Sequence, residues 1–531
     1  MSKICMKVED LEVSLAGSKD KIIKSVNFEL QAGKIFALVG ESGSGKSVTS
    51  MAVMRLLPGA LEITSGSVEA TGRDLFALAE SRMQEVRGRK VAMIFQNAMT
   101  ALNPVQTVGQ QVQETLRLHT PLRGIELRQR VVQLFTEVGI PEPDGRFDFY
   151  PHEMSGGQQQ RVMIAMALAC EPEVLIADEP TTALDVTIQE QVLGLIRELT
   201  QSRQLAVLLI THDMGVVKNT ADDVAVMYRG EIIERAAVDD FFHNPQHEYS
   251  KRLIDALPDL TKFRSVRGKD SLLELSDVKV HFPIKKGVLQ RVVGHTRAVD
   301  GVSLTIGRAE TYALVGESGS GKSTLGRAIL NLEDTAGGEV FFKGKAIQGI
   351  SRTEMLPYRK EIQVIFQNPY SSMNPRLTVN EIICEGMISL GLGLSVQERE
   401  ARVQSLLERV QLSNVYSRRY PHELSGGQLQ RVAIARALAV EPELIICDEP
   451  TSALDVSIRA EVLDLLQELQ SEFKVSYLFI THDLSIVPAL AHFVGVMQSG
   501  KLVEQGSAEQ ILTNPQHPYT KALLASVPRL D

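Results

Sequence analysis

Two glycine-rich stretches in this chain have the residue types that hold phosphate, and their eight residues are identical. The first is Gly40, Glu41, Ser42, Gly43, Ser44, Gly45, Lys46 and Ser47. The second is Gly316, Glu317, Ser318, Gly319, Ser320, Gly321, Lys322 and Ser323. Glycines let such a loop curl so that successive N–H groups point at phosphate oxygens, while the lysine reaches the β- and γ-phosphates and the serine can ligate Mg²⁺. The pattern by itself predicts only nucleotide binding.

An acidic pair follows a short apolar run in each half of the chain. Asp178 and Glu179 follow Val-Leu-Ile-Ala, and Asp448 and Glu449 follow Leu-Ile-Ile-Cys. An aspartate at such a strand end can hold the Mg²⁺ shell, and the neighbouring glutamate can polarise an attacking water as a general base. The structural alternative is a carboxylate pair that caps the next helix.

A glutamine and a histidine also recur at the ends of apolar runs. Gln96 and Gln367 each follow a run of this kind, and His212 and His482 stand in Ile-Thr-His-Asp. At a strand end each histidine is placed to contact a γ-phosphate. A lone histidine is more often structural, but these two occur at the same register.

The spacing of these residues indicates a duplication. Glu179 follows Ser155 by 24 residues and precedes His212 by 33, and both intervals recur around Glu449. Such a repeat predicts two copies of one domain. The copies are offset by 270 residues at the acid pairs but by 276 at the loop lysines, so insertions and deletions lie in the first part of each half.

Each half also contains a Ser-Gly-Gly-Gln sequence at the start of a run with helical spacing. Its residues are Ser155, Gly156, Gly157 and Gln158, and then Ser425, Gly426, Gly427 and Gln428. A serine at a helix start, with two glycines that allow close approach, forms an anion site from free N–H groups and the positive end of the helix dipole. Each half already has a phosphate loop, so this element implies an additional binding surface.

Short apolar runs before the motifs predict buried strands of an α/β sheet with functional residues at the strand ends. In the first half these runs are 34–39, 91–95, 174–177 and 206–210. Between Gln96 and Glu171, and again between Gln367 and Glu441, the periodicity becomes helical. We therefore expect a helical subdomain inserted in each half.

The glycine loop, the glutamine, the Ser-Gly-Gly-Gln sequence, the acid pair and the histidine together resemble the nucleotide-binding domain of ABC transporters, over nearly the whole chain. The resemblance implies an α/β fold of two tandem P-loop NTPase domains that bind ATP and Mg²⁺. In that family the Ser-Gly-Gly-Gln signature of one domain closes over the ATP held by the other. This implies two composite sites.

Carried onto this chain, the resemblance assigns a role to each residue. The first site would combine Lys46, Ser47, Gln96, Asp178, Glu179 and His212 with Ser425–Gln428. The second would combine Lys322, Ser323, Gln367, Asp448, Glu449 and His482 with Ser155–Gln158. The expected catalytic residues are Glu179, His212, Glu449 and His482, and the expected metal ligands are Ser47, Gln96, Asp178, Ser323, Gln367 and Asp448. Because both acids are glutamate and both signatures begin Ser-Gly-Gly-Gln, we expect both sites to hydrolyse ATP.

The two halves differ at three places near these motifs. Phe282 matches the aromatic residue that stacks on adenine in the family, whereas Leu15 stands there in the first half. The other differences are Val48 against Thr324 and Met166 against Arg436. The halves therefore resemble two distinct subunits fused together, and we expect their ATP affinities to be unequal.

Composition excludes several classes of protein. Of the 531 residues 44% are hydrophobic and 23% charged, as in ordinary soluble proteins, and no apolar stretch approaches the roughly 18 residues of a membrane span. The first residues lack the apolar core of a secretion signal, which predicts a cytoplasmic protein. A net charge of −9 gives no general affinity for nucleic acid, and the four cysteines show no zinc-site or disulfide spacing.

Two further pairs of repeated segments indicate which class of ABC transporter the chain resembles. Residues 97–104 match 368–375, and residues 244–258 match 514–528 at eight of fifteen positions. The structural alternative for the second pair is a surface turn followed by a short packing helix. By resemblance, both pairs mark the ATPases of oligopeptide, dipeptide and nickel importers. The single-chain layout is most similar to the fused ATPases of peptide and microcin C importers, followed by those of glutathione importers.

The predicted organisation follows from these segments. We expect a first ABC ATPase domain at 1–243, an importer-type C-terminal motif at 244–258, a linker at 259–270, a second ABC ATPase domain at 271–513 and a second motif at 514–531. Some members of the family that this chain resembles carry an iron–sulfur cluster in the C-terminal motif. No cysteine follows His247 before the junction or His517 before the end, so we expect no cluster.

The resemblance also implies partners and a location. Two integral membrane permeases would bind the chain, an extracytoplasmic solute-binding protein would act indirectly, and neither nucleic acid nor the transported solute would touch it. The chain would lie peripherally on the cytoplasmic face of a bacterial inner membrane. The alternatives are a glutathione or nickel importer ATPase, a sugar or metal importer, or a soluble twin-ABC protein that acts on ribosomes or DNA. Soluble twin-ABC proteins usually have a long charged linker or zinc-type cysteines, which this chain lacks.

Overall fold

The computed structural model describes residues 3–96, 98–181, 186–257, 263–265, 270–286, 291–452 and 454–525. Asn97, Pro258, most of the predicted linker and residues 526–531 of the second motif lie outside this part. The chain divides into two compact units between Asp255 and Ala256. The finer domain boundaries stay predictions.

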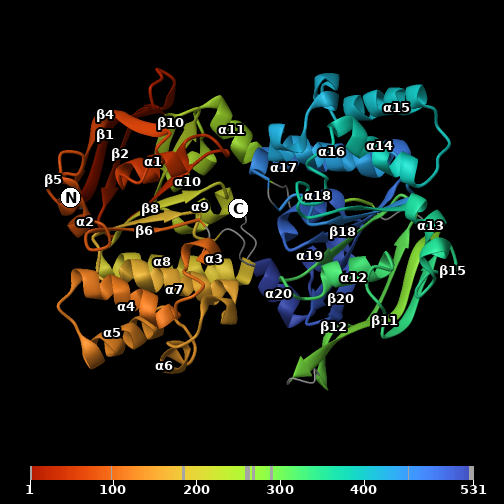
Figure 1. Ribbon diagram of the computed structural model, residues 1–531, viewed down its shortest axis with the longest axis horizontal. Coiled ribbons are helices and arrows are strands. Elements are labelled where there is room, and N and C mark those ends of the chain that lie inside the picture. The colour runs from red at the N-terminus through yellow and green to blue at the C-terminus, as the bar shows by residue number, and fades with distance from the viewer. Residues whose placement is uncertain are drawn as a thin grey trace. The chain divides into compact units, whose positions relative to one another are not determined.

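The first unit combines strands and helices, with a run of helices between β6 (Val91–Ile94) and β7 (Val174–Asp178) (Figure 1). Its elements are β1 (Ile4–Leu15), β2 (Lys21–Gln31), β3 (Ile35–Val39), α1 (Lys46–Val53), β4 (Leu61–Ala70), β5 (Arg73–Asp74), α2 (Glu80–Val86), β6 (Val91–Ile94), α3 (Ala98–Ala101), α4 (Val108–His119), α5 (Gly124–Glu137), α6 (Pro143–Arg146), η1 (Pro151–Glu153), α7 (Gly156–Leu168), β7 (Val174–Asp178), α8 (Val186–Arg203), β8 (Ala206–Thr211), α9 (Met214–Thr220), β9 (Asp223–Tyr228), β10 (Glu231–Ala237), α10 (Val238–His243) and α11 (Glu248–Asp255).

The second unit repeats this order with few changes. Its elements are β11 (Ser271–Lys286), β12 (Arg291–Gly307), β13 (Thr311–Val315), α12 (Lys322–Ile329), β14 (Gly337–Phe342), β15 (Lys345–Ala346), α13 (Arg352–Glu361), β16 (Ile362–Ile365), α14 (Val379–Ser389), α15 (Val396–Arg409), η2 (Asn414–Arg418), η3 (Pro421–Glu423), α16 (Gly426–Leu438), β17 (Leu444–Asp448), α17 (Val456–Phe473), β18 (Ser476–Thr481), η4 (Leu484–Ile486), α18 (Val487–Leu490), β19 (Phe493–Gln498), β20 (Lys501–Ser507), α19 (Ala508–Thr513) and α20 (Pro518–Ala525).

Each unit contains two sheets. In the first unit an antiparallel sheet has the order β2-β1-β4-β5, and a larger sheet has the order β10-β9-β3-β8-β7-β6. In the larger sheet β9, β3, β8, β7 and β6 run parallel, and only the edge strand β10 is antiparallel. The second unit has the corresponding orders β12-β11-β14-β15 and β16-β17-β18-β13-β19-β20. Since β3 and β13 each lie between two parallel neighbours, the phosphate loops that follow them lie at the carboxyl edge where ligands bind in such sheets.

Alternating residues of the central strands enter two separate cores. Along β8, Ala206, Leu208 and Ile210 pack with α1 and the antiparallel sheet. Val207 and Leu209 pack instead with α4, α5 and α7. The continuous apolar run is thus a strand buried on both faces, as a parallel sheet requires. The second core joins the predicted helical subdomain to the sheet, and α4, α5 and α7 lie together in Figure 1.

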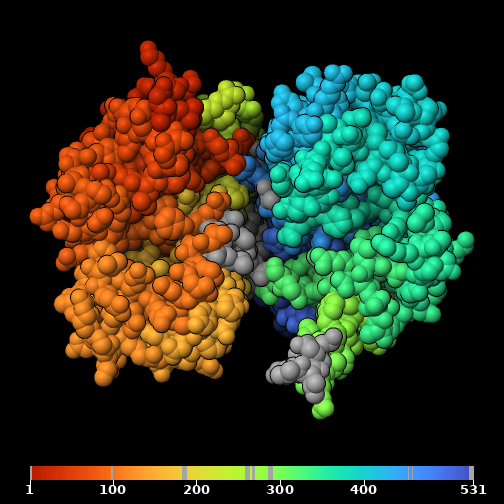
Figure 2. Space-filling view, viewed as in Figure 1, coloured from red at the N-terminus to blue at the C-terminus, as the bar shows by residue number. Residues whose placement is uncertain are grey.

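The antiparallel sheets account for part of the length difference between the halves. Strands β11 and β12 have 16 and 17 residues, against 12 and 11 for β1 and β2. Figure 2 shows the end of the β11–β12 ribbon standing clear of the body of its unit. Residues 287–290 at this end lie outside the described part. Within that part no helix is both long and apolar enough to cross a membrane.

We expect the helical subdomain core to be sensitive to truncation at Phe135, a fully buried residue of α5. Phe135→Ala should lower the free energy of unfolding of the first unit by about 3–5 kcal/mol, because it leaves a cavity. The chain has no tryptophan, so circular dichroism during urea unfolding is a suitable measurement. The control is Leu118→Ala in the neighbouring helix α4, where the side chain is 74% exposed. Equal losses for the two variants would contradict the assignment of Phe135 to this core.

Candidate functional site

The glycine-rich loop of the first unit runs from the end of β3 to the start of α1 and depends on its glycines. Gly40 and Gly45 have φ values of 150° and 110°. A Cβ on Gly40 would run into the carbonyl of Met227, and one on Gly45 would lie 2.5 Å from Ile23 Cδ1. The second unit repeats this at Gly316 against Met497 and at Gly321 against Ala298. The loop is therefore pressed against the sheet, and its curl needs residues without side chains.

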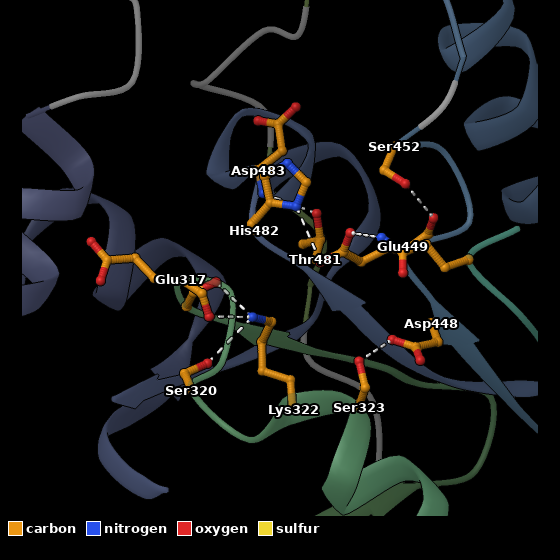
Figure 3. A network of polar contacts seen from close by, with 12 residues as sticks. Glu317, Ser320, Lys322, Ser323, Asp448, Glu449, Ser452, Thr481, His482 and Asp483 are labelled. Atoms are coloured by element: carbon orange, nitrogen blue, oxygen red, sulfur yellow. Dashed lines mark hydrogen bonds and ion pairs between the residues drawn. The ribbon is translucent and has the colours of Figure 1, made fainter. Parts of the chain in front are cut away.

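A lysine ammonium group lies inside each curled loop. Lys46 Nζ donates to the carbonyl oxygens of Gly40 and Glu41 at 2.7 and 2.8 Å and to Ser44 Oγ at 3.5 Å. Lys322 makes the same three contacts in the second unit, as Figure 3 shows. Both lysines are buried. A positive charge at the centre of the loop, beside the N–H groups at the helix start, attracts phosphate.

The serine after each lysine reaches the aspartate of the acid pair. Ser47 Oγ donates to Asp178 Oδ1 at 3.1 Å, and Ser323 Oγ donates to Asp448 Oδ1 at 2.7 Å. Burial raises the pKa of both aspartates, and the serine hydrogen bonds only partly offset this effect. A buried carboxylate of this kind is stabilised by a cation.

The oxygen atoms gathered here fit Mg²⁺. A hydroxyl and a carboxylate oxygen are hard ligands, and Mg²⁺ usually takes only one or two carboxylates from a protein and completes its shell with phosphate and water. The described residues contain no cluster of three or more His, Cys, Asp or Glu side chains that would suit a metal without such a substrate. The pair Ser47 and Asp178, with its counterpart Ser323 and Asp448, is thus suited to a nucleotide-bound Mg²⁺.

The glutamate of each acid pair is fixed from two sides. Gln96 Nε2 donates to Glu179 Oε2 at 2.6 Å, and His212 Nδ1 lies 3.0 Å from Glu179 Oε1. In the second unit Gln367 Nε2 donates to Glu449 Oε2 at 2.8 Å, and His482 Nδ1 lies 3.2 Å from Glu449 Oε1. The glutamine, glutamate and histidine follow three neighbouring strands of the sheet, β6, β7 and β8 in the first unit, so the strand order brings them together.

The backbone and the charges also act on this glutamate. Glu179 and Glu449 have φ values of 47° and 46°, a left-handed conformation that residues other than glycine rarely adopt. Burial alone would raise the pKa of Glu449, but His482, Lys322 and Gln367 together outweigh it and lower this pKa. Burial alone would lower the pKa of His482, but Glu449 raises it. These shifts favour a carboxylate beside an imidazolium. Figure 3 shows the side chains of Glu449, His482 and Lys322 in the same site.

The Ser-Gly-Gly-Gln signature begins helix α7 and is hydrogen-bonded to itself. Ser155 Oγ accepts from Gln158 N at 3.4 Å, and Gln158 Oε1 accepts from Ser155 N at 3.2 Å. A Cβ on Gly157 would lie 2.6 Å from Ile188 Cγ2 of α8. The counterparts Ser425, Gln428 and Gly427 make the same contacts, the last against Ile458. The second glycine therefore lets two helices pack closely, and the expected part of both glycines in an anion site stays a prediction.

Leu15 and Phe282 occupy equivalent places on the antiparallel sheets. Val13 pairs with Ile23, which lies against the loop glycine Gly45, and Leu15 is two residues beyond Val13. In the second unit Val280 pairs with Val299, next to the Ala298 that borders Gly321, and Phe282 is two residues beyond Val280. Leu15 is 40% exposed and Phe282 is 39% exposed. Both side chains thus stand on the strand that passes beside the loop.

One contact at the loop was missed at the sequence level. The backbone N–H of Glu41 donates to Tyr249 Oη at 3.2 Å, and that of Glu317 donates to Tyr519 Oη at 3.1 Å. Both tyrosines belong to the repeated segments 244–258 and 514–528, and the tyrosine is one of their identical positions. The identity of the tyrosine in both segments could have indicated a role for it. Nothing in the sequence shows, however, that the segment folds back to the loop.

Comparison with known families identifies the chain. The sequence profile described as "ABC transporter" matches residues 23–182 and 299–452, more than half of the chain. The chain belongs to the ABC transporter ATP-binding family. A second profile, "Oligopeptide/dipeptide transporter, C-terminal region", matches residues 233–277 and 503–531. Both profiles match twice, once in each half.

Curated relatives match nearly the whole length of this ABC protein. It is 48% identical over 98% of the chain to the peptidoglycan transport ATP-binding protein YejF of Agrobacterium fabrum, covering 96% of that protein. It is 45% identical over 98% of the chain to the glutathione import ATP-binding protein GsiA of Escherichia coli K12, covering 89% of that protein. Among solved structures, cbiO1 of Clostridium perfringens is 30% identical over 46% of the chain and 92% of its own length, with a TM-score of 0.41.

These matches confirm two predictions from the sequence. The fold is a tandem pair of ABC-type P-loop ATPase domains. The chain binds and hydrolyses ATP as the subunit that powers an ABC importer. The roles of individual residues stay predictions, although each unit brings its loop, aspartate, glutamate, glutamine and histidine together.

We expect both glutamates to act in hydrolysis. Glu179→Gln and Glu449→Gln should each lower phosphate release at saturating ATP and Mg²⁺, and the double change should lower it roughly 10²-fold or more, because a general base is lost. The control Glu190→Gln, at an exposed position on α8, should retain full activity. Full ATPase activity in either single variant would refute the expectation of two hydrolytic sites.

We also expect the Leu15–Phe282 difference to set unequal nucleotide affinities. Phe282→Ala should weaken ATP binding at the second loop by roughly 5- to 150-fold, the range expected for loss of base stacking. Leu15→Phe should strengthen binding at the first loop, while the control Leu15→Ile should leave it unchanged. Photolabelling with 8-azido-ATP, followed by mapping of the labelled peptides, measures each site separately. A tighter first site in Leu15→Ile as well as Leu15→Phe would argue against stacking.

Proposed function

We propose that this chain energises the uptake of peptides or peptide-like compounds, of the kind handled by microcin C importers, through two separate membrane permeases. The observation that carries the proposal is the oligopeptide/dipeptide transporter C-terminal region, which occurs once in each half. The names of the relatives support the same substrate class. Glutathione is a tripeptide, and peptidoglycan contains short peptide stems.

In each unit the proposed chemistry starts from the loop. Lys46 binds the β- and γ-phosphates together with the N–H groups of the curl, and Gly40 and Gly45 allow the backbone to approach them. Ser47 and Asp178 would hold Mg²⁺, with Gln96 as a further oxygen ligand. When bound, Mg²⁺ neutralises charge on the phosphates. Lys322, Ser323, Asp448 and Gln367 have these roles in the second unit.

Hydrolysis then needs a base and a group that senses the γ-phosphate. Glu179 is oriented by Gln96 and His212, and its carboxylate can accept a proton from the attacking water. His212 follows β8 and can reach the γ-phosphate with the ring nitrogen that does not face Glu179. Glu449 and His482 would act in the same way in the second unit.

We further propose that the signature of each unit completes the ATP site of the other. Ser155–Gln158 and Ser425–Gln428 each begin a 13-residue helix, so their N–H groups and the helix dipole offer a phosphate site in addition to the loop. ATP would then close the two units and hydrolysis would let them open, with the helical subdomains passing the motion to the permeases. The solute need not touch this chain. Its place would be the cytoplasmic face of the inner membrane, with a solute-binding protein acting from the other side.

The experiment is copurification of the tagged chain from membranes, followed by uptake assays. We expect two integral permeases to copurify, and loss of the chain to abolish uptake of a labelled tripeptide or muropeptide. The double variant Glu179→Gln/Glu449→Gln should keep the permeases but not restore uptake. The second candidate function is glutathione import, supported by the name of the GsiA relative. Loss of glutathione uptake alone would favour this second candidate. Recovery with ribosomes and no permease would overturn the transport proposal.

A further inference from the structure

The repeated C-terminal segment reaches the phosphate loop in both units. Tyr249 lies in α11, at the end of the first unit, yet its hydroxyl oxygen accepts the N–H of Glu41 at 3.2 Å. Tyr519 in α20 accepts the N–H of Glu317 at 3.1 Å. The partners are 208 and 202 residues apart in sequence, so each contact is formed only by the tertiary fold.

A second set of contacts fixes the segment that carries the tyrosine. In the first unit the carboxylate of Glu234, on β10, accepts the N–H groups of Gln246 and His247 at 2.7 and 2.9 Å. His247 Nδ1 in turn accepts the N–H of Tyr249 at 3.1 Å. The second unit repeats these contacts through Glu504, Gln516, His517 and Tyr519, at 2.7, 3.0 and 3.2 Å. The turn before the helix is therefore anchored to the edge of the sheet, which sets the position of the tyrosine.

The backbone at Glu41 is then held on both sides. Its N–H is bonded to Tyr249, and its carbonyl oxygen accepts from Lys46 Nζ at 2.8 Å. This residue links Gly40, whose φ of 150° turns the chain away from β3, to Ser42–Gly45, whose N–H groups line the curl. The hydrogen bonds on the two peptide groups around Glu41 therefore fix the backbone where the loop begins. Losing an acceptor at a part-buried N–H is costly, so removing the hydroxyl should weaken this conformation of the loop.

We propose that Tyr249 and Tyr519 are positioning residues for ATP binding, each holding the phosphate loop of its own unit in the conformation that binds phosphate. The C-terminal segment is then part of the ATP site and not only a packing element. This inference depends on the chain being an ABC ATPase, and it holds or fails independently of the transported solute.

The test uses the full-length chain with Tyr249→Phe and Tyr519→Phe, which remove one hydroxyl each and keep the rings. Hydrogen exchange of the peptides that cover residues 40–47 and 316–323 is followed as ATP is added without Mg²⁺, so that nucleotide is bound but not hydrolysed. In Tyr249→Phe we expect the ATP concentration for half-protection of the first loop to rise about fivefold, as for loss of one hydrogen bond, with the second loop unchanged. Tyr519→Phe should give the mirror result.

Steady-state kinetics provide a second readout. A positioning role predicts a higher KM for ATP with a nearly unchanged kcat, because saturating nucleotide restores the loop. The matched control is Tyr228→Phe, since the Tyr228 ring packs 4.3 Å from the Tyr249 ring and the change also removes only a hydroxyl. The control should leave KM and both half-protection points unchanged.

A third variant acts on the tyrosine from a distance. Glu234→Ala withdraws the acceptor of the Gln246 and His247 N–H groups, so we expect it to weaken ATP protection of the first loop alone. Combined with Tyr249→Phe it should add little, because both changes act through the same contact. Unchanged half-protection in both tyrosine variants, or equal changes at both loops in each of them, would overturn the proposal.

Discussion

The site in each unit depends on a lysine ammonium group enclosed by its own loop. Lys46 can occupy the curl only because the backbone of Gly40 and Glu41 turns its carbonyl oxygens inward, at 2.7 and 2.8 Å from Nζ. That turn requires a φ of 150° at Gly40, against the carbonyl of Met227 on the neighbouring strand β9. The position of the buried lysine charge therefore depends on the glycine conformation, and that conformation brings the loop against β9. A change in any of them would move the N–H groups of the loop.

The parallel sheet meets this requirement and also delivers the other groups. β3 lies between β8 and β9, and β7 lies between β8 and β6. The residues that follow β6, β7 and β8 therefore meet at one edge, where Glu179 is held by Gln96 and His212. Adjacent strands explain why residues 83 and 33 positions apart in sequence are within hydrogen-bonding distance. The helical subdomain packs against the same strands through its core, which includes Ile94 at the end of the strand that precedes Gln96.

Much of this could be predicted from the sequence, because it depends on local patterns. Apolar runs that end in functional residues predicted β3, β6, β7 and β8 to within a residue or two at each end. Three features could not be predicted, since each depends on tertiary contacts. These are the left-handed backbone of Glu179, the packing of Gly157 against Ile188, and the hydrogen bond from Glu41 to Tyr249. The last is formed by a segment that resembles a surface turn with a short helix until its position relative to the sheet is known.

The two units also act as a comparison within one chain. Several contacts differ between them: the N–H that begins the central strand is bound by Asp222 Oδ2 in one unit and by His492 Nδ1 in the other. The ring partner Tyr228 is replaced by Gln498 at the same register. At these places the two units therefore use different types of side chain. The tyrosine–loop hydrogen bond does not vary in this way.

Among the contacts that are the same in both units, several lie around the phosphate loop. They are the lysine in the curl, the serine–aspartate bond, the glutamine and histidine on the glutamate, and the tyrosine on the loop N–H. If the tyrosine only served packing of the C-terminal segment, its hydroxyl could be replaced as freely as the Tyr228 ring is. Its retention beside the nucleotide-binding groups, in units that differ at Leu15, Val48 and Met166, is what the proposed positioning role predicts.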